Sequence, residues 1–273
     1  MQTLSALSVE SECPHIVRYF NSWIEDDRIH IVMELCEKSL SQVRNEAKAS
    51  LKRLRNEDRH LGFIPEEELR KIIRDILLGL NELHKQGIVH LDIKPGNILL
   101  GKNKNYKLGD LGMARFLTKI TEDNNIPEGD CRYLAKELLS RDVLAYIPDL
   151  KKCDIFSLGI TAYELITLQD LEKNGPEWRS LRNGTFEYPK EIQDLYSPEI
   201  LETIRHMLEE HTDDRPSADE LLSTVFKSAE QRRIDHLQRE NEKLLSNQYK
   251  LFEFLRQNGV DVQTICQNLQ IED

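Results

Sequence analysis

The residues best suited to chemistry lie in two short stretches near the middle of the chain. Residues 90–97 read HLDIKPGN and contain Asp92, Lys94 and Asn97, and a second stretch, DLG, begins at Asp110. Side chains of these types can accept a proton, neutralise negative charge and bind a cation, so these stretches are candidates for a site of chemistry. A loop of capping Asp and Asn residues beside a surface lysine is the plain alternative, but the spacing and the flanking elements favour a site.

The elements around these stretches would hold them in position. Pro65 precedes three glutamates, and a fixed φ followed by negative charge favours the start of a helix. Apolar residues at helical spacing then continue as far as Gly87, which would stop the helix. These apolar residues are Leu69, Ile72, Ile73, Ile76, Leu77, Leu80 and Leu83. Two short apolar strands are predicted near residues 98–100 and 106–108.

The patterns predict mainly strands in the N-terminal part of the chain and mainly helices in the part that follows. Residues 14–35 alternate apolar and aromatic side chains around a polar break at 25–28, which predicts a β-hairpin. Residues 44–60 are densely charged and lack a sustained apolar face, which predicts a solvated loop or an exposed helix between the two halves of the fold. From Asp154 to about Phe226 helical patterns dominate. This order predicts an α+β fold.

After Phe226 the composition changes to charged and polar residues with a repeating seam. The seam positions, spaced alternately by three and four, are Ile234, Leu237, Asn241, Leu244, Gln248, Leu251 and Leu255. Such spacing over about three heptads is typical of a short coiled coil, in which an Asn at a core position fixes the register of two strands. The helix would therefore form a homodimer, pack on its own domain or stand in solvent.

The composition excludes some classes of function. The net charge of -11 disfavours a broad surface for nucleic acid or anionic membrane, because both need an excess of basic residues. Five cysteines lie far apart without a CxxC pair, which indicates reduced thiols. No apolar run approaches the roughly 20 residues that span a bilayer, and no signal sequence follows Met1. We expect a soluble intracellular protein, nuclear or cytoplasmic, with a protein or small-molecule partner and neither nucleic acid nor membrane.

Residues 90–97, followed by a strand, a turn, a second strand and Asp110, resemble the catalytic loop and the metal-binding turn of protein kinases. The resemblance implies a protein-kinase-like fold and an enzyme that uses ATP and Mg²⁺. Asp92 would accept the proton of the substrate hydroxyl, and Lys94 would steady the γ-phosphate. Asn97 and Asp110 would each hold a Mg²⁺ ion.

The same resemblance implies where adenine would bind. Met33 stands at the position of the gatekeeper, and the backbone from Glu34 to Cys36 would form the hinge that hydrogen-bonds the base. Leu99 would lie beneath the ring. For Met33 and Leu99, ordinary strand core is the alternative interpretation.

Three further residues resemble structural positions of protein kinases. Glu137 ends a run, LAKE, that stands where kinases carry Ala-Pro-Glu, with Lys136 in place of the usual proline. Arg215 resembles the late arginine that forms a buried ion pair with this glutamate. Asp154 resembles the helix-start aspartate that accepts N–H groups of the catalytic loop, and a simple helix cap is the alternative.

Finer features resemble the Wee/Myt group of kinases, which inhibit cyclin-dependent kinases. They are the run EGDCRYLA at 128–135, Leu91 and Ile93 in the catalytic loop, residues 154–161, and the tryptophan-containing run at 175–184. The resemblance implies phosphorylation of a tyrosine near the nucleotide loop of a cyclin-dependent kinase. Because the sequence of the catalytic loop is typical of Ser/Thr kinases, the acceptor residue stays open between tyrosine and Ser/Thr.

Some observations favour other functions. Residues 19–23 and 34–36 also resemble the Ser/Thr kinases that phosphorylate a translation initiation factor. No Gly-rich loop and no lysine-bearing strand of the kinase N-lobe precede residue 14. The chain is therefore expected to be an N-terminally truncated kinase or a kinase-derived module that binds a partner without catalysis.

We expect three parts along the chain. A partial kinase N-lobe would occupy residues 1–36, the kinase C-lobe residues 37–226, and a helical extension residues 227–273. In this arrangement the resemblance to kinases covers about residues 14–226.

Overall fold

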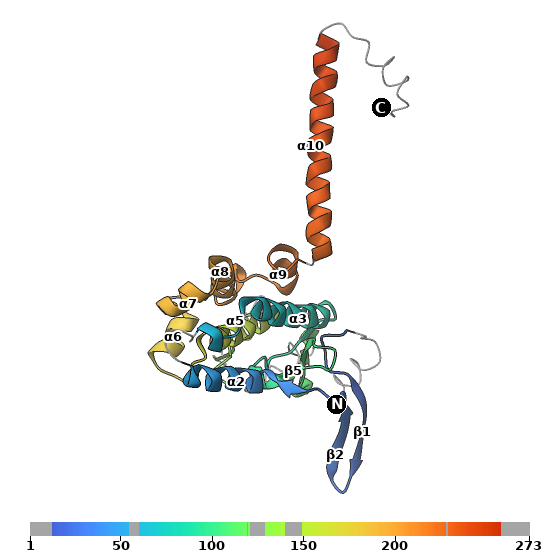
Figure 1. Ribbon diagram of the computed structural model, residues 1–273. Coiled ribbons are helices and arrows are strands. Elements are labelled where there is room, and N and C mark those ends of the chain that lie inside the picture. Colours follow the sequence, from blue (N-terminus) through green and yellow to red (C-terminus); the bar gives the residue numbers. More distant parts are fainter. Residues whose placement is uncertain are drawn as a thin grey trace. The chain divides into compact units, whose positions relative to one another are not determined.

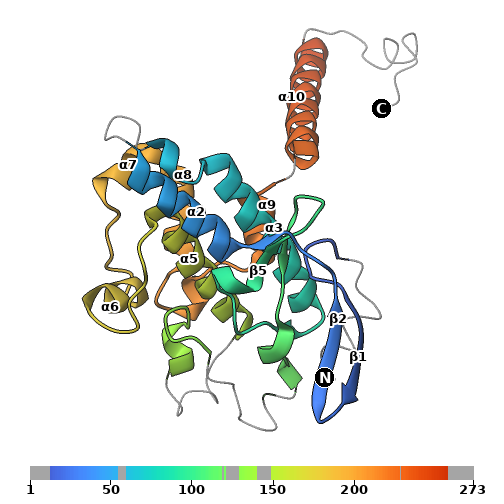
Figure 2. The ribbon, with the colours of Figure 1, turned by 60° about the horizontal axis from the view of Figure 1, so that its bottom comes forward.

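The computed structural model describes residues 13–54, 60–118, 120, 129–139, 149–227 and 229–257. The chain divides into two compact units, Met1–Phe226 and Lys227–Asp273. In the second unit the structure describes one helix, α10 (Ala229–Gln257). All other elements belong to the first unit, shown in Figures 1 and 2.

The first element is the predicted hairpin, and the structure confirms it (Figure 1). Strands β1 (Tyr19–Glu25) and β2 (Arg28–Met33) pair antiparallel. The two turn residues, Asp26 and Asp27, both have positive φ, the conformation that a tight two-residue hairpin turn requires. The hairpin exposes large apolar side chains: Phe20, Trp23, Ile24, Ile29, Ile31, Val32 and Met33.

A three-stranded antiparallel sheet joins this region to the helical half. It consists of β3 (Lys38–Ser39), β5 (Ile98–Leu100) and β6 (Tyr106–Leu108), with β5 in the middle. The N–H of Val17 donates to the carbonyl of Leu108 at 2.8 Å, which ties the segment before the hairpin to β6. The strands predicted at 98–100 and 106–108 are therefore confirmed.

A second strand pair encloses both stretches of candidate chemistry. Strand β4 (Ile88–Val89) pairs antiparallel with β7 (Arg115–Phe116). The N–H of Leu117 extends the pairing by donating to the carbonyl of Gly87 at 2.8 Å. Residues 90–114 form the excursion between these strands, so its two ends are fixed to each other.

Helix α3 (Glu66–Lys85) confirms the predicted long helix. All seven of its predicted apolar positions are completely buried. Gly87, with φ +70°, follows its end, as a residue in the left-handed conformation commonly does after a helix. At Gly79 a side chain would lie 2.7 Å from the carbonyl oxygen of His15, so glycine permits the close approach of the two segments.

The expectation for residues 44–60 is only partly correct. Helix α2 (Leu40–Arg53) begins with a capping box between Ser39 and Gln42, so a helix forms, but it is not an exposed one. Leu40 and Arg44 are buried, and further residues of the helix pack against the core: Val43, Ala47 and Leu51. Charged residues around this narrow stripe hid it from the sequence pattern, and residues 55–59 lie outside the described part.

The helical half is confirmed, and its centre is α5 (Lys151–Thr167). This helix is buried on almost every side, as expected for a helix in the core of a domain, and it packs on α3 and α8 (Figures 1 and 2). The other helices of this half are α6 (Pro176–Arg182), α7 (Lys190–Leu195), α8 (Pro198–Met207) and α9 (Ala218–Thr224).

The predicted ion pair between Glu137 and Arg215 is present. Nη1 of Arg215 lies 2.7 Å from Oε1 of Glu137, and the arginine side chain is completely buried. The guanidinium also donates to the carbonyls of Glu209 and Lys152. The pair therefore connects residues 129–139, the described end of what corresponds to the activation segment of protein kinases, to the segment between α8 and α9.

We predict that Glu137→Ala lowers the free energy of unfolding by about 3–5 kcal/mol, because it leaves the buried charge of Arg215 without its partner. Urea unfolding would measure this loss. Lys136→Ala is the matched control, since it removes a neighbouring but exposed ion pair with Glu210 and should change little. Equal effects of the two substitutions would contradict the prediction.

Candidate active site

The candidate catalytic loop is held by a buried carboxylate. Asp154, on α5, accepts hydrogen bonds from the N–H groups of His90 and Leu91 at 2.9 and 2.8 Å. Nε2 of His84, on α3, lies 2.9 Å from the same carboxylate. This confirms the predicted contact between Asp154 and the loop. The contact holds Leu91 with φ +63°, an unusual backbone conformation for leucine.

The surroundings of Asp154 favour its charged form. Complete burial alone would raise the pKa of this carboxyl, but the hydrogen bond and charge of His84, together with His90, outweigh that effect. The pKa therefore lies below the ordinary value for aspartate. The carboxylate stays charged at neutral pH and can keep accepting the loop N–H groups.

The structure brings Asp92, Lys94 and Asn97 together. Nζ of Lys94 lies 2.9 and 2.8 Å from the two carboxylate oxygens of Asp92. Nδ2 of Asn97 donates to the backbone carbonyl of Asp92 at 2.9 Å and to its Oδ2 at 2.6 Å. A short 3₁₀ helix, η2 (Pro95–Asn97), turns the chain so that Asn97 faces back toward Asp92.

Asp110 is placed next to this cluster by backbone hydrogen bonds. The N–H of Gly109 donates to the carbonyl of Asn97 at 2.8 Å, and Nε2 of His90 lies 3.0 Å from the carbonyl of Gly109. Asp110 itself has φ +50°, and its Oδ1 accepts the N–H of Gly112 at 3.2 Å. All four predicted site residues are therefore carried by two directly connected turns.

These residues fit a magnesium–nucleotide complex. The amide nitrogen of Asn97 is occupied by Asp92, which leaves its carbonyl oxygen as a ligand. Asp110 supplies carboxylate oxygen. Mg²⁺ prefers oxygen ligands, typically one or two from the protein together with phosphate and water. Within the described residues, no group of three His, Cys, Asp or Glu side chains could hold a metal without such help.

The candidate adenine residues lie at the end of β2, in the segment that follows it, and in β5, the middle strand of the three-stranded sheet. Glu34 follows β2, and its N–H donates to the carbonyl of Arg18 at 2.7 Å. Its carboxylate lies 2.7 Å from Nζ of Lys107, a buried residue of β6, so the hinge is tied to the sheet. Leu99 is half-buried in β5, opposite Lys107.

Two other adenine candidates differ in their surroundings. Met33 is 51% exposed, so the alternative interpretation of this residue as strand core is wrong for this structure. Cys36 is partly buried, and this burial raises the pKa of its thiol.

Arg182 is a structural residue of the site that sequence reasoning did not single out. It is buried, and burial lowers the pKa of its guanidinium to about 10. Instead of a carboxylate it contacts the indole of Trp178, with its central carbon 3.9 Å from the ring centre. Its donors bind the carbonyls of Cys131, Arg132 and Leu134. Arg182 thereby holds the described end of the activation segment against α6.

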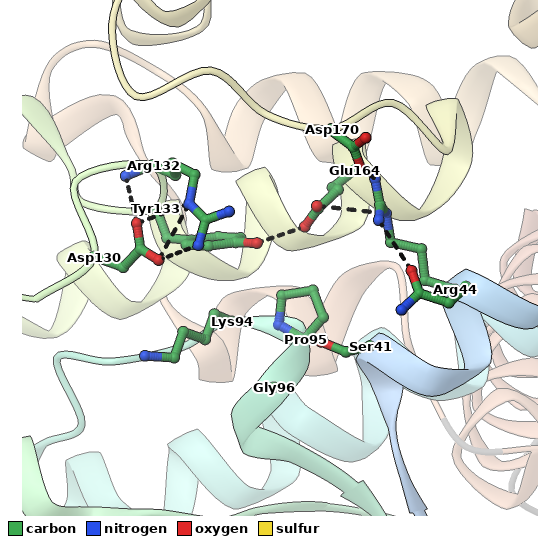
Figure 3. Close-up of a pocket in the computed structure, with 11 residues that line it drawn as sticks. Ser41, Arg44, Lys94, Pro95, Gly96, Asp130, Arg132, Tyr133, Glu164 and Asp170 are labelled. Atoms are coloured by element: carbon green, nitrogen blue, oxygen red, sulfur yellow. Dashed lines mark hydrogen bonds and ion pairs between the residues drawn. The ribbon is translucent and has the colours of Figure 1, made fainter. Parts of the chain in front are cut away.

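Next to the catalytic loop lies a pocket of about 410 Å³, shown in Figure 3. Residues of α2, the catalytic loop, the activation segment and the end of α5 line it. In this pocket the hydroxyl of Tyr133 donates to Glu164 at 2.7 Å, and Arg44 lies between Glu164 and Asp170. Sequence reasoning missed Glu164 and Asp170 because nothing local marks them. Residue 128 of the predicted signature lies outside the described residues.

Comparison with known families agrees with this geometry. A family model described as "Protein kinase domain" matches residues 2–227, and the chain belongs to this family. The predicted α+β, protein-kinase-like fold is thus confirmed.

The predicted resemblance to the Wee/Myt group is also confirmed. The chain is 36% identical over 208 residues to the membrane-associated tyrosine- and threonine-specific cdc2-inhibitory kinase of Drosophila melanogaster, covering 76% of this chain and 35% of that protein. It is 35% identical over 222 residues to a Wee1-like protein kinase of Arabidopsis thaliana, covering 81% and 39%. It is 34% identical over 230 residues to Wee1-like protein kinase 2 of Homo sapiens, covering 75% and 37%.

The chain spans well under half the length of these relatives. Among the helices that the structure describes, none combines the length and the apolar character needed to cross a membrane.

We predict that Asp154→Asn destabilises the chain and changes its response to acid. Asn offers one acceptor oxygen where the carboxylate offers two, and an unpaired buried N–H costs about 1–3 kcal/mol. In the unaltered chain the stability that comes from the lowered pKa is present above the ordinary Asp value of about 3.9 and is lost as the pH falls through the folded-state value.

Urea unfolding of both chains from about pH 7 to about pH 2.5 would measure the two effects. The variant should start from a lower free energy of unfolding and lose less of it on the acid side. Parallel curves for the two chains would contradict the proposed charge state of Asp154.

Proposed function

We propose that this chain is the catalytic region of a Wee/Myt-type protein kinase, which transfers the γ-phosphoryl group of ATP to a hydroxyl of a cyclin-dependent kinase and so inhibits it. The observation that carries the proposal is the convergence of Asp92, Lys94 and Asn97 beside Asp110. The similarity to the cdc2-inhibitory and Wee1-like kinases supports the substrate class.

In this mechanism Asp92 orients the substrate hydroxyl and takes its proton while the hydroxyl oxygen attacks the γ-phosphorus. The bond between that phosphorus and the oxygen that bridges it to the β-phosphate breaks, and ADP is the leaving group. Lys94, which contacts both oxygens of Asp92, neutralises charge on the transferred group. Asn97 and Asp110 would hold Mg²⁺, which would supply charge neutralisation for the phosphates. Asn97 also fixes the carboxylate of Asp92 through its amide nitrogen.

The hinge would bind adenine through the carbonyl of Glu34 and the N–H of Cys36. The N–H of Glu34 is already donated to Arg18, and the salt bridge to Lys107 fixes the direction of the hinge. Leu99 would contact one face of the base, and Met33 would lie beside it as the gatekeeper. A nucleotide placed here would have its phosphates directed toward Asp110.

Two other functions are distinguishable by experiment. A kinase for a translation initiation factor would use the same site residues on a different protein. A noncatalytic module would bind a partner without turnover. The residues of the candidate site favour catalysis, since Asp92, Lys94, Asn97 and Asp110 are all the residue types that the kinase motif requires at these positions.

We predict that Asp92→Asn lowers the turnover of a cyclin-dependent kinase substrate by about 10²–10⁴-fold, because it removes the group that accepts the hydroxyl proton. Binding of Mg-ATP should stay nearly unchanged. Transfer of labelled phosphate to an inactive cyclin-dependent kinase would measure turnover, with its candidate tyrosine replaced by phenylalanine in a parallel sample.

Asp194→Asn, on the exposed side of α7, is the matched control and should leave turnover intact. Binding is measured as stabilisation by Mg-ATP, which amounts to about 2.7 kcal/mol at 100 times the Kd. Turnover of the initiation factor alone would favour the second kinase class. Neither turnover nor stabilisation by Mg-ATP would favour the noncatalytic module.

We also propose that α10 forms a parallel two-stranded coiled coil with a second copy of the chain. The seam residues Ile234, Leu237, Leu244 and Leu251 are 41–66% exposed, and Asn241 provides the polar core position that fixes register. The side chain of Leu255 lies outside those described.

We predict that Leu244→Lys converts the dimer to a monomer, because it places a charge in the seam. Sedimentation equilibrium would measure the mass. Tyr249→Lys changes an equally exposed residue off the seam and should leave the dimer intact. A monomeric unaltered chain at micromolar concentration would overturn the dimer.

A further inference from the structure

The pocket beside the catalytic loop contains charged residues beyond those that the proposed reaction uses. Figure 3 shows Arg132, Tyr133 and Glu164 along one wall and Lys94, Pro95 and Ser41 along the other, with Arg44 at one end. Because Lys94 contacts Asp92, this space begins next to the position of the acceptor hydroxyl.

The carboxylates of the pocket already have partners. Glu164 accepts the hydroxyl of Tyr133 at 2.7 Å. Asp170 receives Nη2 of Arg44 at 2.8 Å and, from outside the pocket, Nζ of Lys48 at 2.7 Å. Asp130 accepts two hydrogen bonds from Arg132, whose Nε and Nη2 lie 3.0 and 2.5 Å from the two carboxylate oxygens. A basic ligand would therefore find each carboxylate paired.

The hydrogen-bond donors of the pocket, in contrast, are in surplus. The side chain of Arg44 is only 8% exposed. Its Nε is the one buried side-chain nitrogen or oxygen without a hydrogen-bond partner in the described part of the chain. This Nε forms an ion pair with Oε1 of Glu164 at 3.4 Å but no hydrogen bond, and Nη2 of Arg44 also donates to the carbonyl of Gln169 at 2.5 Å. Nη1 of Arg44 reaches only Oδ1 of Asn45, at 3.5 Å.

The opposite end of the pocket repeats this pattern. Arg132 contacts Asp130 through Nε and Nη2, and its Nη1 donates to no residue that the structure describes. Burial raises the pKa of Glu164, although the hydrogen bond of Tyr133 and the charge of Arg44 act against the rise.

We propose that this pocket binds an anionic side chain of the protein substrate, a carboxylate or a phosphorylated hydroxyl, within a few residues of the acceptor. The inference rests on the proposed function for the presence of a protein substrate. Arginine presents several N–H groups in a fixed plane that matches carboxylate and phosphate oxygens. Nη1 of Arg44 makes only a long hydrogen bond to Asn45, and among the described residues Asp130 engages only Nε and Nη2 of Arg132. The volume of about 410 Å³ accommodates either anion.

The test measures peptide binding to the full chain by fluorescence anisotropy, so that it needs no turnover. Each peptide carries a central tyrosine and one Glu, phosphoserine, Gln or Lys at one of three positions on either side. We expect one position at which Glu or phosphoserine binds about tenfold more tightly than Gln, with Lys weakest. Equal binding of Glu, phosphoserine and Gln at every position, or tighter binding of Lys, would overturn the proposal.

Arg44→Met should abolish this preference and reverse it toward Lys, because it removes the buried donor and releases Glu164 and Asp170. Lys52→Met removes the same charge from an exposed position of α2 and should keep the preference. Because Arg44 is buried, Arg132→Gln on the opposite wall provides an independent variant, which should weaken binding of the anionic peptide. An unchanged preference in both arginine variants would contradict the assignment.

The two anionic peptides distinguish the source of the charge. A preference for Glu indicates an acidic residue in the substrate sequence, and a preference for phosphoserine indicates a substrate already phosphorylated nearby. If the peptides show the anion preference while phosphoryl transfer is absent, the pocket assignment stands and only the proposed catalysis fails.

Discussion

The fully buried carboxylate of Asp154 is the interaction on which the candidate site depends. It receives the N–H groups of His90 and Leu91 from the catalytic loop and lies against His84 of α3. A buried charge is tolerated only where hydrogen bonds and an opposite charge compensate for lost water, and these three contacts provide the compensation. The loop therefore leaves β4 in a fixed direction, and the position of Asp92 follows from it.

The end of the activation segment is held by two buried arginines that use different partners. Arg215 pairs with the carboxylate of Glu137, whereas Arg182 binds the backbone carbonyls of the segment and stacks on Trp178. The carbonyl oxygens accept hydrogen bonds from the Arg182 guanidinium, so its positive charge is stabilised without a buried carboxylate. Arg182 binds carbonyls on both sides of Tyr133, whose hydroxyl donates to Glu164 in the pocket, so this arginine also shapes the surface next to the proposed acceptor position.

The elements that sequence patterns predicted correctly are those whose pattern is local. The seven apolar residues of α3 recur at helical spacing, and the strands at 98–100 and 106–108 lie between clear turn residues. Helix α2 was harder to predict from the sequence because its buried stripe is narrow and includes the charged residue Arg44. The partners that permit this burial are Glu164, near the end of α5, and Asp170, just after that helix, and both are far away in the sequence.

By itself the sequence determined the order of strands and helices, the kinase-like loop with Asp92, Lys94 and Asn97, the ion pair of Glu137 with Arg215, and the resemblance to Wee/Myt kinases. Motif spacing carries this information because each motif is short and its chemistry requires particular residue types. Only the tertiary structure decided that Arg44 is buried, that Arg182 clamps the activation segment, and that the pocket has donors in excess. Those properties arise where segments distant in the sequence meet, and a local pattern records neither the meeting nor which hydrogen bonds it leaves unmade.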